Sequence, residues 1–145
     1  MNLLGSAVFA LVRWRARNGL AGDDGTGRRT GIRGETYAYW FLRRQGYILV
    51  ARNYQVPGLR GEIDLVGYDG PQLAFVEVKT RTADNAEPEL AVTPEKQRLL
   101  TRMARRFLAE RHIRDSLWRF DVVAIRSRPG RPPDVRLHKD AFAEK

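Results

Sequence analysis

Acidic and basic side chains alternate with apolar ones along two short segments that a tight turn joins. Glu62 and Asp64 lie two residues apart on the first segment, and Glu77 and Lys79 lie two apart on the second. Side chains at this spacing point to the same face of a β-strand, so each pair shares one face of a sheet. A buried carboxylate without a partner costs several kcal/mol, so this pattern requires a compensating group.

The compensating group that these residue types favour is a divalent cation. If neighbouring antiparallel strands bring Asp64 and Glu77 together, their carboxylates repel each other unless a proton or a cation lies between them. Mg²⁺ prefers carboxylates, carbonyls, waters and phosphate oxygens, and the peptide carbonyl of Val78 is a natural further ligand. Lys79 can hold or deprotonate a water, or stabilise negative charge that develops on a phosphate. The spacing therefore indicates metal-assisted hydrolysis of a phosphodiester.

Two helices and five strands are predicted around these residues. Residues 32–45 have apolar side chains at helical spacing, and Thr93 with Pro94 provides an N-cap and a first residue for a second helix. Short turns make the first three strands antiparallel, and the second helix makes the next connection a right-handed parallel crossover. We therefore predict an α/β fold, a mixed sheet flanked by helices in the order α-β-β-β-α-β-β. The predicted strands are residues 47–56, 62–69, 72–80, 118–127 and, at an edge, 135–139.

Residues 1–27 differ from the rest of the chain and are predicted to form an N-terminal extension to a domain at 28–145. Their pattern fits a short amphipathic helix followed by a flexible glycine-rich linker. The longest apolar run, Ala7 to Val12, is far shorter than a membrane span, and no basic segment precedes it as in a signal peptide. We therefore expect no stable membrane insertion.

The chain of 145 residues has a net charge of +9 and no cysteine. The lack of cysteine excludes disulfides, thiolate zinc sites and a cysteine nucleophile, and it fits a cytoplasmic protein. The charge is uneven: residues 1–33 have six basic and two acidic side chains, 34–92 have six and eight, and 93–145 have fourteen and seven. Such a surface suits a polyanion such as nucleic acid, although an arginine-rich composition that keeps the protein soluble has the same charge.

The ordered set of motifs resembles a known group of nucleases. D-x(12)-E-V-K, with the acid-x-lysine on a strand after a hairpin, resembles the core of the PD-(D/E)XK nuclease superfamily. GEIDLV, FVEVKTR, AVTPEK and RFDVV, in this order, resemble the small bacterial YraN-like family within it, which is related to archaeal Holliday-junction resolvases. The likeness runs from about Gly27 to Phe142 and implies a restriction-endonuclease-like sheet.

The resemblance also implies roles for individual residues. Asp64 and Glu77 become ligands for Mg²⁺ or Mn²⁺, Lys79 becomes the catalytic lysine, and Glu35 becomes an additional acid that reaches the metal directly or through water. Ile63 stands where the superfamily motif often has proline. Two structural alternatives remain open: Glu77 and Lys79 form an exposed ion pair, or Glu35 is a first-turn acid favoured by the helix dipole.

Other charged residues have less distinctive patterns. Glu62 shares the face of Asp64, and we favour a surface charge at the strand end over a place in the site. Lys96 stands in the first turn of its helix, where a lysine and a helix N-terminus suit a phosphate group. A stripe of arginines follows on this helix, either as a solvated face or along a nucleic-acid backbone. Asp121 interrupts an apolar strand and is predicted to pair with a basic neighbour. The predicted nucleic-acid contacts are Lys96, Arg98, Arg102, Arg105 and Arg81.

Three functions are compatible with these observations. The first is a Mg²⁺-dependent endonuclease that acts on branched or otherwise structured DNA, with a homodimer suggested by the likeness to resolvases. The second is a nucleic-acid-binding module that keeps the fold without catalysis. Clustered acids argue against it, because a protein that only binds a polyanion does not need carboxylates facing it. The third is an interaction or membrane-surface protein that works through residues 1–27. We rank the nuclease first because Asp64, Glu77 and Lys79 are the residue types that its chemistry requires.

Overall fold

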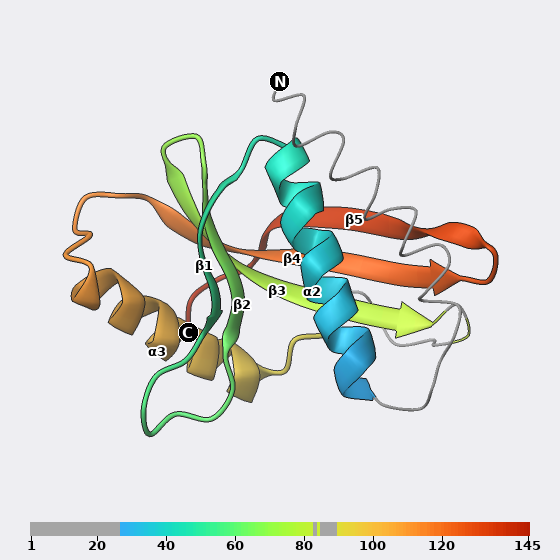
Figure 1. The fold of residues 1–145 in the computed structure, drawn as a ribbon. Coiled ribbons are helices and arrows are strands. Elements are labelled where there is room, and N and C mark those ends of the chain that lie inside the picture. The colour runs from blue at the N-terminus through green and yellow to red at the C-terminus, as the bar shows by residue number, and fades with distance from the viewer. Residues whose placement is uncertain (1–26, 83, 85–89) are drawn as a thin grey trace.

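A five-stranded mixed sheet with a helix on each face organises the protein (Figure 1). The computed structural model describes residues 27–82, 84 and 90–145, with the backbone alone for 27–33. The elements are α2 (Gly27–Arg44), β1 (Ile48–Tyr54), β2 (Ile63–Asp69), β3 (Gln72–Thr82), α3 (Pro94–Glu110), β4 (Trp118–Arg128) and β5 (Arg131–Phe142).

The topology confirms the predicted fold. The strands follow one another across the sheet in chain order, β1-β2-β3-β4-β5. The first three are antiparallel, β3 and β4 are parallel across the α3 crossover, and β5 returns antiparallel at the edge. The order α-β-β-β-α-β-β is therefore confirmed. Within the described ranges, no helix is long and apolar enough to cross a membrane.

The central strand β3 divides the core into two halves because its side chains alternate between the faces of the sheet. Leu73 and Phe75 pack in the half that α3 covers, whereas Ala74 and Val76 pack in the half that α2 covers. In the first half the ring of Phe75 meets that of Phe107 edge to face, with centroids 5.6 Å apart. A residue on β3 thus faces one helix or the other according to its parity, and Glu77 and Lys79 fall on the α3 side.

Local sequence explains where α3 begins. The Thr93 side chain accepts a hydrogen bond from the Lys96 N–H at 3.2 Å, and Pro94 occupies the first helical position. The apolar stripe Leu100, Met103 and Phe107 is buried against the sheet, which supplies most of the helix's stability. The predicted N-cap is confirmed.

The ends of two elements differ from the prediction. Helix α2 begins at Gly27 rather than 32, because extending an existing helix adds a hydrogen bond per residue and outweighs the low propensity of its glycines. The edge strand β5 spans Arg131–Phe142 rather than 135–139, and it tolerates Pro132 and Pro133 because an edge strand has backbone positions that pair with no neighbour. The predicted N-terminal extension lies outside the described residues, apart from Gly27.

Asp121 is fully buried and is the centre of a polar network on the α2 side. It accepts hydrogen bonds from the Tyr47 hydroxyl at 2.8 Å and from Nε of Arg119 at 2.8 Å. Burial and the Asp121 carboxylate raise the pKa of Tyr47 above its ordinary value, which keeps the hydroxyl a donor. The predicted pairing of Asp121 with a basic neighbour is confirmed.

Helix α2 packs tightly against β3 at Gly34. A Cβ atom at this position would overlap Oγ1 of Thr80, so only glycine fits without movement. Glu35 is the next residue of the helix, and its height above the sheet is therefore set by this contact.

We predict that Gly34→Ala lowers the free energy of unfolding by about 1–3 kcal/mol, because the added methyl overpacks the contact with Thr80. Urea denaturation measures the change, and Thr80→Ala alone provides the reference. The double variant Gly34→Ala/Thr80→Ala should regain most of the loss, since the overlapping hydroxyl is gone. A gain in stability for Gly34→Ala alone, as at an open helix position, would contradict the close packing.

Candidate metal centre

Carboxylates from α2 and the start of β2 converge at one point. Glu35, Glu62 and Asp64 each place one carboxylate oxygen within 4.8 Å of the others. Asp64 is buried, and the other two are half-buried. Acidic groups often gather on surfaces without an ion, so the contacts around these three decide what the cluster can do.

The strand pairing opens a gap in the sheet at this place. Strand β3 continues to Thr82, but its pairing with β2 ends at Leu65 and Val76. The next position in this register brings Asp64 opposite Glu77, on the same face. Instead of a ladder bond, the Val78 N–H donates to Oδ2 of Asp64 at 2.7 Å. Side chains from both faces of the sheet therefore meet beside the free edge of β3.

Burial and mutual repulsion raise the pKa values of two of the acids, Asp64 and Glu35. Burial and, to a smaller extent, the nearby Glu77 carboxylate raise the pKa of Asp64 to about 8. The hydrogen bond from the Val78 N–H lowers this pKa, but by less. Burial likewise raises the pKa of Glu35, helped by the charge of Glu62. Only 9 % of Asp64 and 7 % of Glu77 is exposed, so water screens this repulsion weakly. Among the described residues, the positive charge near Asp64 does not offset the effect of burial and of the neighbouring carboxylates on its pKa.

Two lysines supply part of that charge from the α3 side. Nζ of Lys96, in the first turn of α3, forms an ion pair with Oε1 of Glu77. Lys79 is 7 % exposed, and its Nζ donates to the carbonyl of Ala91 just before α3. The prediction of an exposed Glu77–Lys79 pair as an alternative is wrong, because both residues are buried and Glu77 pairs with Lys96.

The donor atoms fit a hard divalent cation. The cluster offers carboxylate oxygens, with no thiolate or imidazole among its members, and such sets suit Mg²⁺ and Mn²⁺. The N–H and C=O groups of a strand residue point toward the same neighbour, so the Val78 carbonyl faces the gap along with its N–H. The raised pKa of Asp64 adds to the fit, since a bound cation would replace the proton that this carboxyl retains at neutral pH.

The structure places Glu35 and Asp64 in one acid cluster, and Glu77 lies close enough to raise the pKa of Asp64; Lys79 shares the strand face of Glu77. The catalytic and metal-binding roles of these residues stay predictions. Glu62 is half-buried just before β2, and one of its carboxylate oxygens lies within 4.8 Å of those of Glu35 and Asp64, which favours a place in the acid cluster over a surface charge alone. Sharing the face of Asp64 was the sequence signal that pointed to it.

The basic side chains predicted to bind nucleic acid are spread along β3 and α3. Lys96 adjoins the acids through Glu77. Arg98 and Arg102 are exposed on α3, whereas Arg105 is paired with Glu144 at 3.2 Å. Nη1 of Arg81 donates to the Thr80 carbonyl at 3.0 Å. The assignment of nucleic-acid contacts stays a prediction for all five.

A mixed sheet of this order, with Asp64 on one strand and the Glu77-x-Lys79 pair on the next, defines the PD-(D/E)XK nuclease superfamily. Residues 34–125 match the model of the family described as uncharacterised protein family UPF0102. The chain belongs to this family, the YraN family, which is part of that superfamily.

Relatives that match over most of both chains support the assignment. A UPF0102 protein of Koribacter versatilis is 42% identical over 122 residues, covering 83% of each chain. A UPF0102 protein of Geotalea uraniireducens is 38% identical over 121 residues, covering 83% of this chain and 94% of its own. A third, from Pelobacter propionicus, is 45% identical over 118 residues, covering 79% of this chain and 83% of its own.

We predict that the stability of the metal-free protein falls as pH rises from about 4 to about 8. The pKa of Asp64 is raised from 3.8 to about 8 on folding, so in this window the folded state keeps a proton that the unfolded state releases. Stability from this group is complete below the unfolded pKa and is lost as pH rises through the folded pKa. The loss is at most about 1.4 kcal/mol per pH unit.

Asp64→Asn is the matched control, since the amide oxygen still accepts from the Val78 N–H but does not titrate. Urea denaturation in a chelator, at several pH values, should give a steeper decline for the wild type than for Asp64→Asn. Parallel curves for the two proteins would contradict the raised pKa.

Proposed function

We propose that the protein is a metal-dependent nuclease that hydrolyses phosphodiester bonds in nucleic acid. The observation that carries the proposal is the gathering of Asp64, Glu35 and Glu62 close to the buried Glu77, on whose strand Lys79 is also buried. Such a set is costly to bury and offers nothing to packing, but it provides oxygen ligands and a positive charge at one place. The net charge of +9 favours a polyanionic substrate.

The residues that would hold Mg²⁺ or Mn²⁺ are Asp64, Glu77 and Glu35, with the carbonyl of Val78. When bound, the cation supplies positive charge that polarises the phosphodiester and favours ionisation of water. Glu62 lies within reach of the same oxygens and adds a further carboxylate to the cluster.

Lys79 provides the fixed positive charge of the site. Its ammonium is held by the Ala91 carbonyl on the face of the sheet that also holds Glu77. An ammonium fixed in a buried site stabilises negative charge on a phosphate more strongly than one in water, because little solvent has to reorganise. Lys96, at the N-terminal turn of α3, is placed to balance Glu77 and to receive a phosphate oxygen.

The substrate class is narrowed by the likeness to resolvases rather than by any base-reading side chain. We propose structured DNA, such as a branched junction, as the preferred substrate, and a homodimer as the form that would cut two strands. A cytoplasmic location also stays a prediction.

A nucleic-acid-binding module without catalysis is the second candidate. The observation that favours it is the Lys96–Glu77 ion pair, which neutralises one acid of the cluster with a group of the protein itself. This function predicts binding that depends on salt and is indifferent to divalent metal. The third candidate, an interaction or membrane-surface protein that works through residues 1–27, stays a prediction, because this segment lies outside the described residues apart from Gly27.

We predict that the purified protein with Mg²⁺ or Mn²⁺ cuts a DNA four-way junction, and that Lys79→Ala lowers the single-turnover rate about 100-fold or more. Lys139→Ala is the matched control: it removes the same charge from an exposed lysine that pairs with Asp69, and it should cut normally. Linear duplex and single-stranded DNA measured alongside would establish substrate preference.

Circular dichroism should show that the Lys79→Ala protein remains folded. Cutting that survives in both Lys79→Ala and Asp64→Asn would identify a contaminating nuclease. Metal-indifferent, salt-sensitive binding without cutting of any substrate would replace the nuclease with the binding module.

A further inference from the structure

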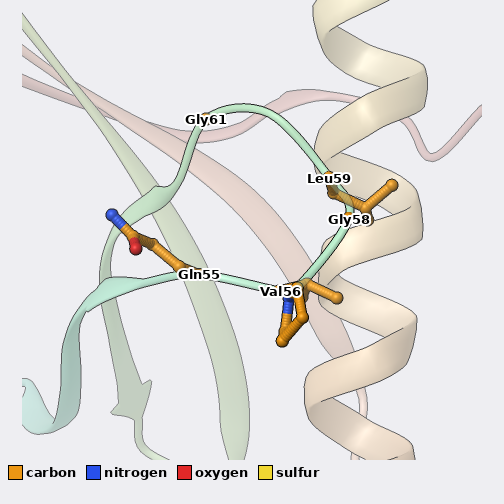
Figure 2. Close-up of a pocket in the computed structure, with 6 residues that line it drawn as sticks. Gln55, Val56, Gly58, Leu59 and Gly61 are labelled. Atoms are coloured by element: carbon orange, nitrogen blue, oxygen red, sulfur yellow. The ribbon is translucent and has the colours of Figure 1, made fainter.

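The connection between β1 and β2 forms two adjoining hollows, and the second of them lies against α3. The first has a volume of about 440 Å³ and is lined by Gln55, the turn Val56–Leu59 and Gly61 (Figure 2). The second has a volume of about 350 Å³ and lies between the same turn and two side chains of α3, Arg102 and Arg106. Both volumes fall in the range of small-ligand sites, about 300–1,000 Å³.

The sequence fixes the shape of the turn. The Leu59 N–H donates to the Val56 carbonyl at 3.0 Å, with Pro57 at the second position and Gly58 at the third. Gly58 has φ of +84°, which a type II turn requires at this position and which glycine adopts without strain. The turn is therefore ordered by its own residues.

Contacts at both ends hold this connection along α3. Just before the connection, at the end of β1, the Tyr54 hydroxyl donates to Glu110 at 2.8 Å. The Tyr54 ring meets the Phe107 ring edge to face, with centroids 5.1 Å apart. Near its end, Gly61 lies against the side chain of Leu99. The chain thus runs from the C-terminal part of α3 toward its N-terminal part, and the hollows are preformed.

The charge beside the second hollow is positive and incompletely balanced. Over the described part of the chain, Arg102 has no ion pair, whereas Arg106 donates to Glu110 at 2.9 Å. Like charges at this i, i+4 spacing repel each other, so an anion between Arg102 and Arg106 would be favoured. Arginine binds phosphate groups well because its planar fork offers several donors.

The hollows lead to the acid cluster. Gln55, which lines the first hollow, donates through its side-chain amide to Oε2 of Glu62 at 3.3 Å. In Figure 2 the Gln55 side chain points away from α3, whereas the Val56 and Leu59 side chains lie on the α3 side. A surface path therefore joins Arg102 and Arg106 to the carboxylates across a single short connection.

We propose that this path, which we call the loop–α3 groove (Gln55–Gly61 with Arg102 and Arg106), binds phosphate groups of a DNA strand next to the bond that is cut. The placement of the cut rests on the proposed function. Arg102 and Arg106 lie six and ten residues beyond Lys96, a rise of about 9 and 15 Å along the helix. One strand of B-form DNA advances about 3.4 Å per nucleotide, so the groove holds phosphates about three to four nucleotides from the cut.

Arg105 separates this proposal from a general effect of basic charge. It is exposed on the same helix between the two groove arginines, but it pairs with Glu144 near the C-terminus and lines neither hollow. Replacing Arg102 or Arg105 by alanine removes the same charge, and both substitutions favour the helix.

The experiment measures binding without cutting, with Asp64→Asn as the parent protein. Fluorescence anisotropy with a short labelled DNA duplex, in a chelator, gives Kd over a range of salt concentrations. We expect Arg102→Ala and Arg106→Ala each to reduce the slope of log Kd against log salt by about 0.9 and to weaken binding about eightfold at about 0.1 M salt. Arg105→Ala should leave the slope unchanged, in contrast to the prediction from the sequence that the whole arginine stripe contacts nucleic acid, because Arg105 lines neither hollow and is paired with Glu144.

Equal slopes for the three variants would overturn the groove while leaving the nuclease proposal intact. A reduced slope for Arg102→Ala and Arg106→Ala, in a protein whose wild type cuts no DNA, would support the groove as a DNA site and remove the nuclease. Thermal unfolding of each variant shows whether the fold is kept; Arg102→Ala is decisive, since Arg102 has no ion pair to lose within the described residues.

Discussion

Repulsion between two buried carboxylates on neighbouring strands is the constraint on which the site depends. Asp64 and Glu77 lie on one face of the sheet, where burial removes the water that would otherwise screen them. Two contacts reduce this repulsion: the Val78 N–H donates a hydrogen bond to Asp64, and the Lys96 ammonium forms an ion pair with Glu77. These contacts reduce the cost without abolishing it, which is why the pKa of Asp64 stays high.

The strand that carries Glu77 is held firmly, because β3 is packed on both faces and is paired on both edges up to Val76. Beyond that residue β4 is the one described strand that continues beside β3, and the acids gather at the opposite edge, where the pairing with β2 has ended. Overpacking at Gly34 would lift Glu35, whereas loosening of α3 would release Lys96. Each helix therefore controls one charged group of the site.

The sequence was sufficient for those parts of the site that lie on strands. A period of two placed Asp64, Glu77 and Lys79 on shared faces, and turn lengths gave the strand directions. Glu35 came only from the resemblance, because no local spacing relates a helix position to a strand far along the chain. The pair of Lys96 with Glu77 was not foreseen for the same reason: it joins residues that only the α3 crossover brings together.

The connection between β1 and β2 links chemistry to binding through one residue. Glu62 ends this connection and also belongs to the acid cluster, and Gln55 at its start donates to the same carboxylate. The Pro57-Gly58 turn between them rests on α3 beside Arg102. Because the type II turn and the contacts with α3 fix this connection, a strand held in the groove would meet a carboxylate that is already in position. Preorganisation of this kind places the cost of ordering in folding rather than in binding.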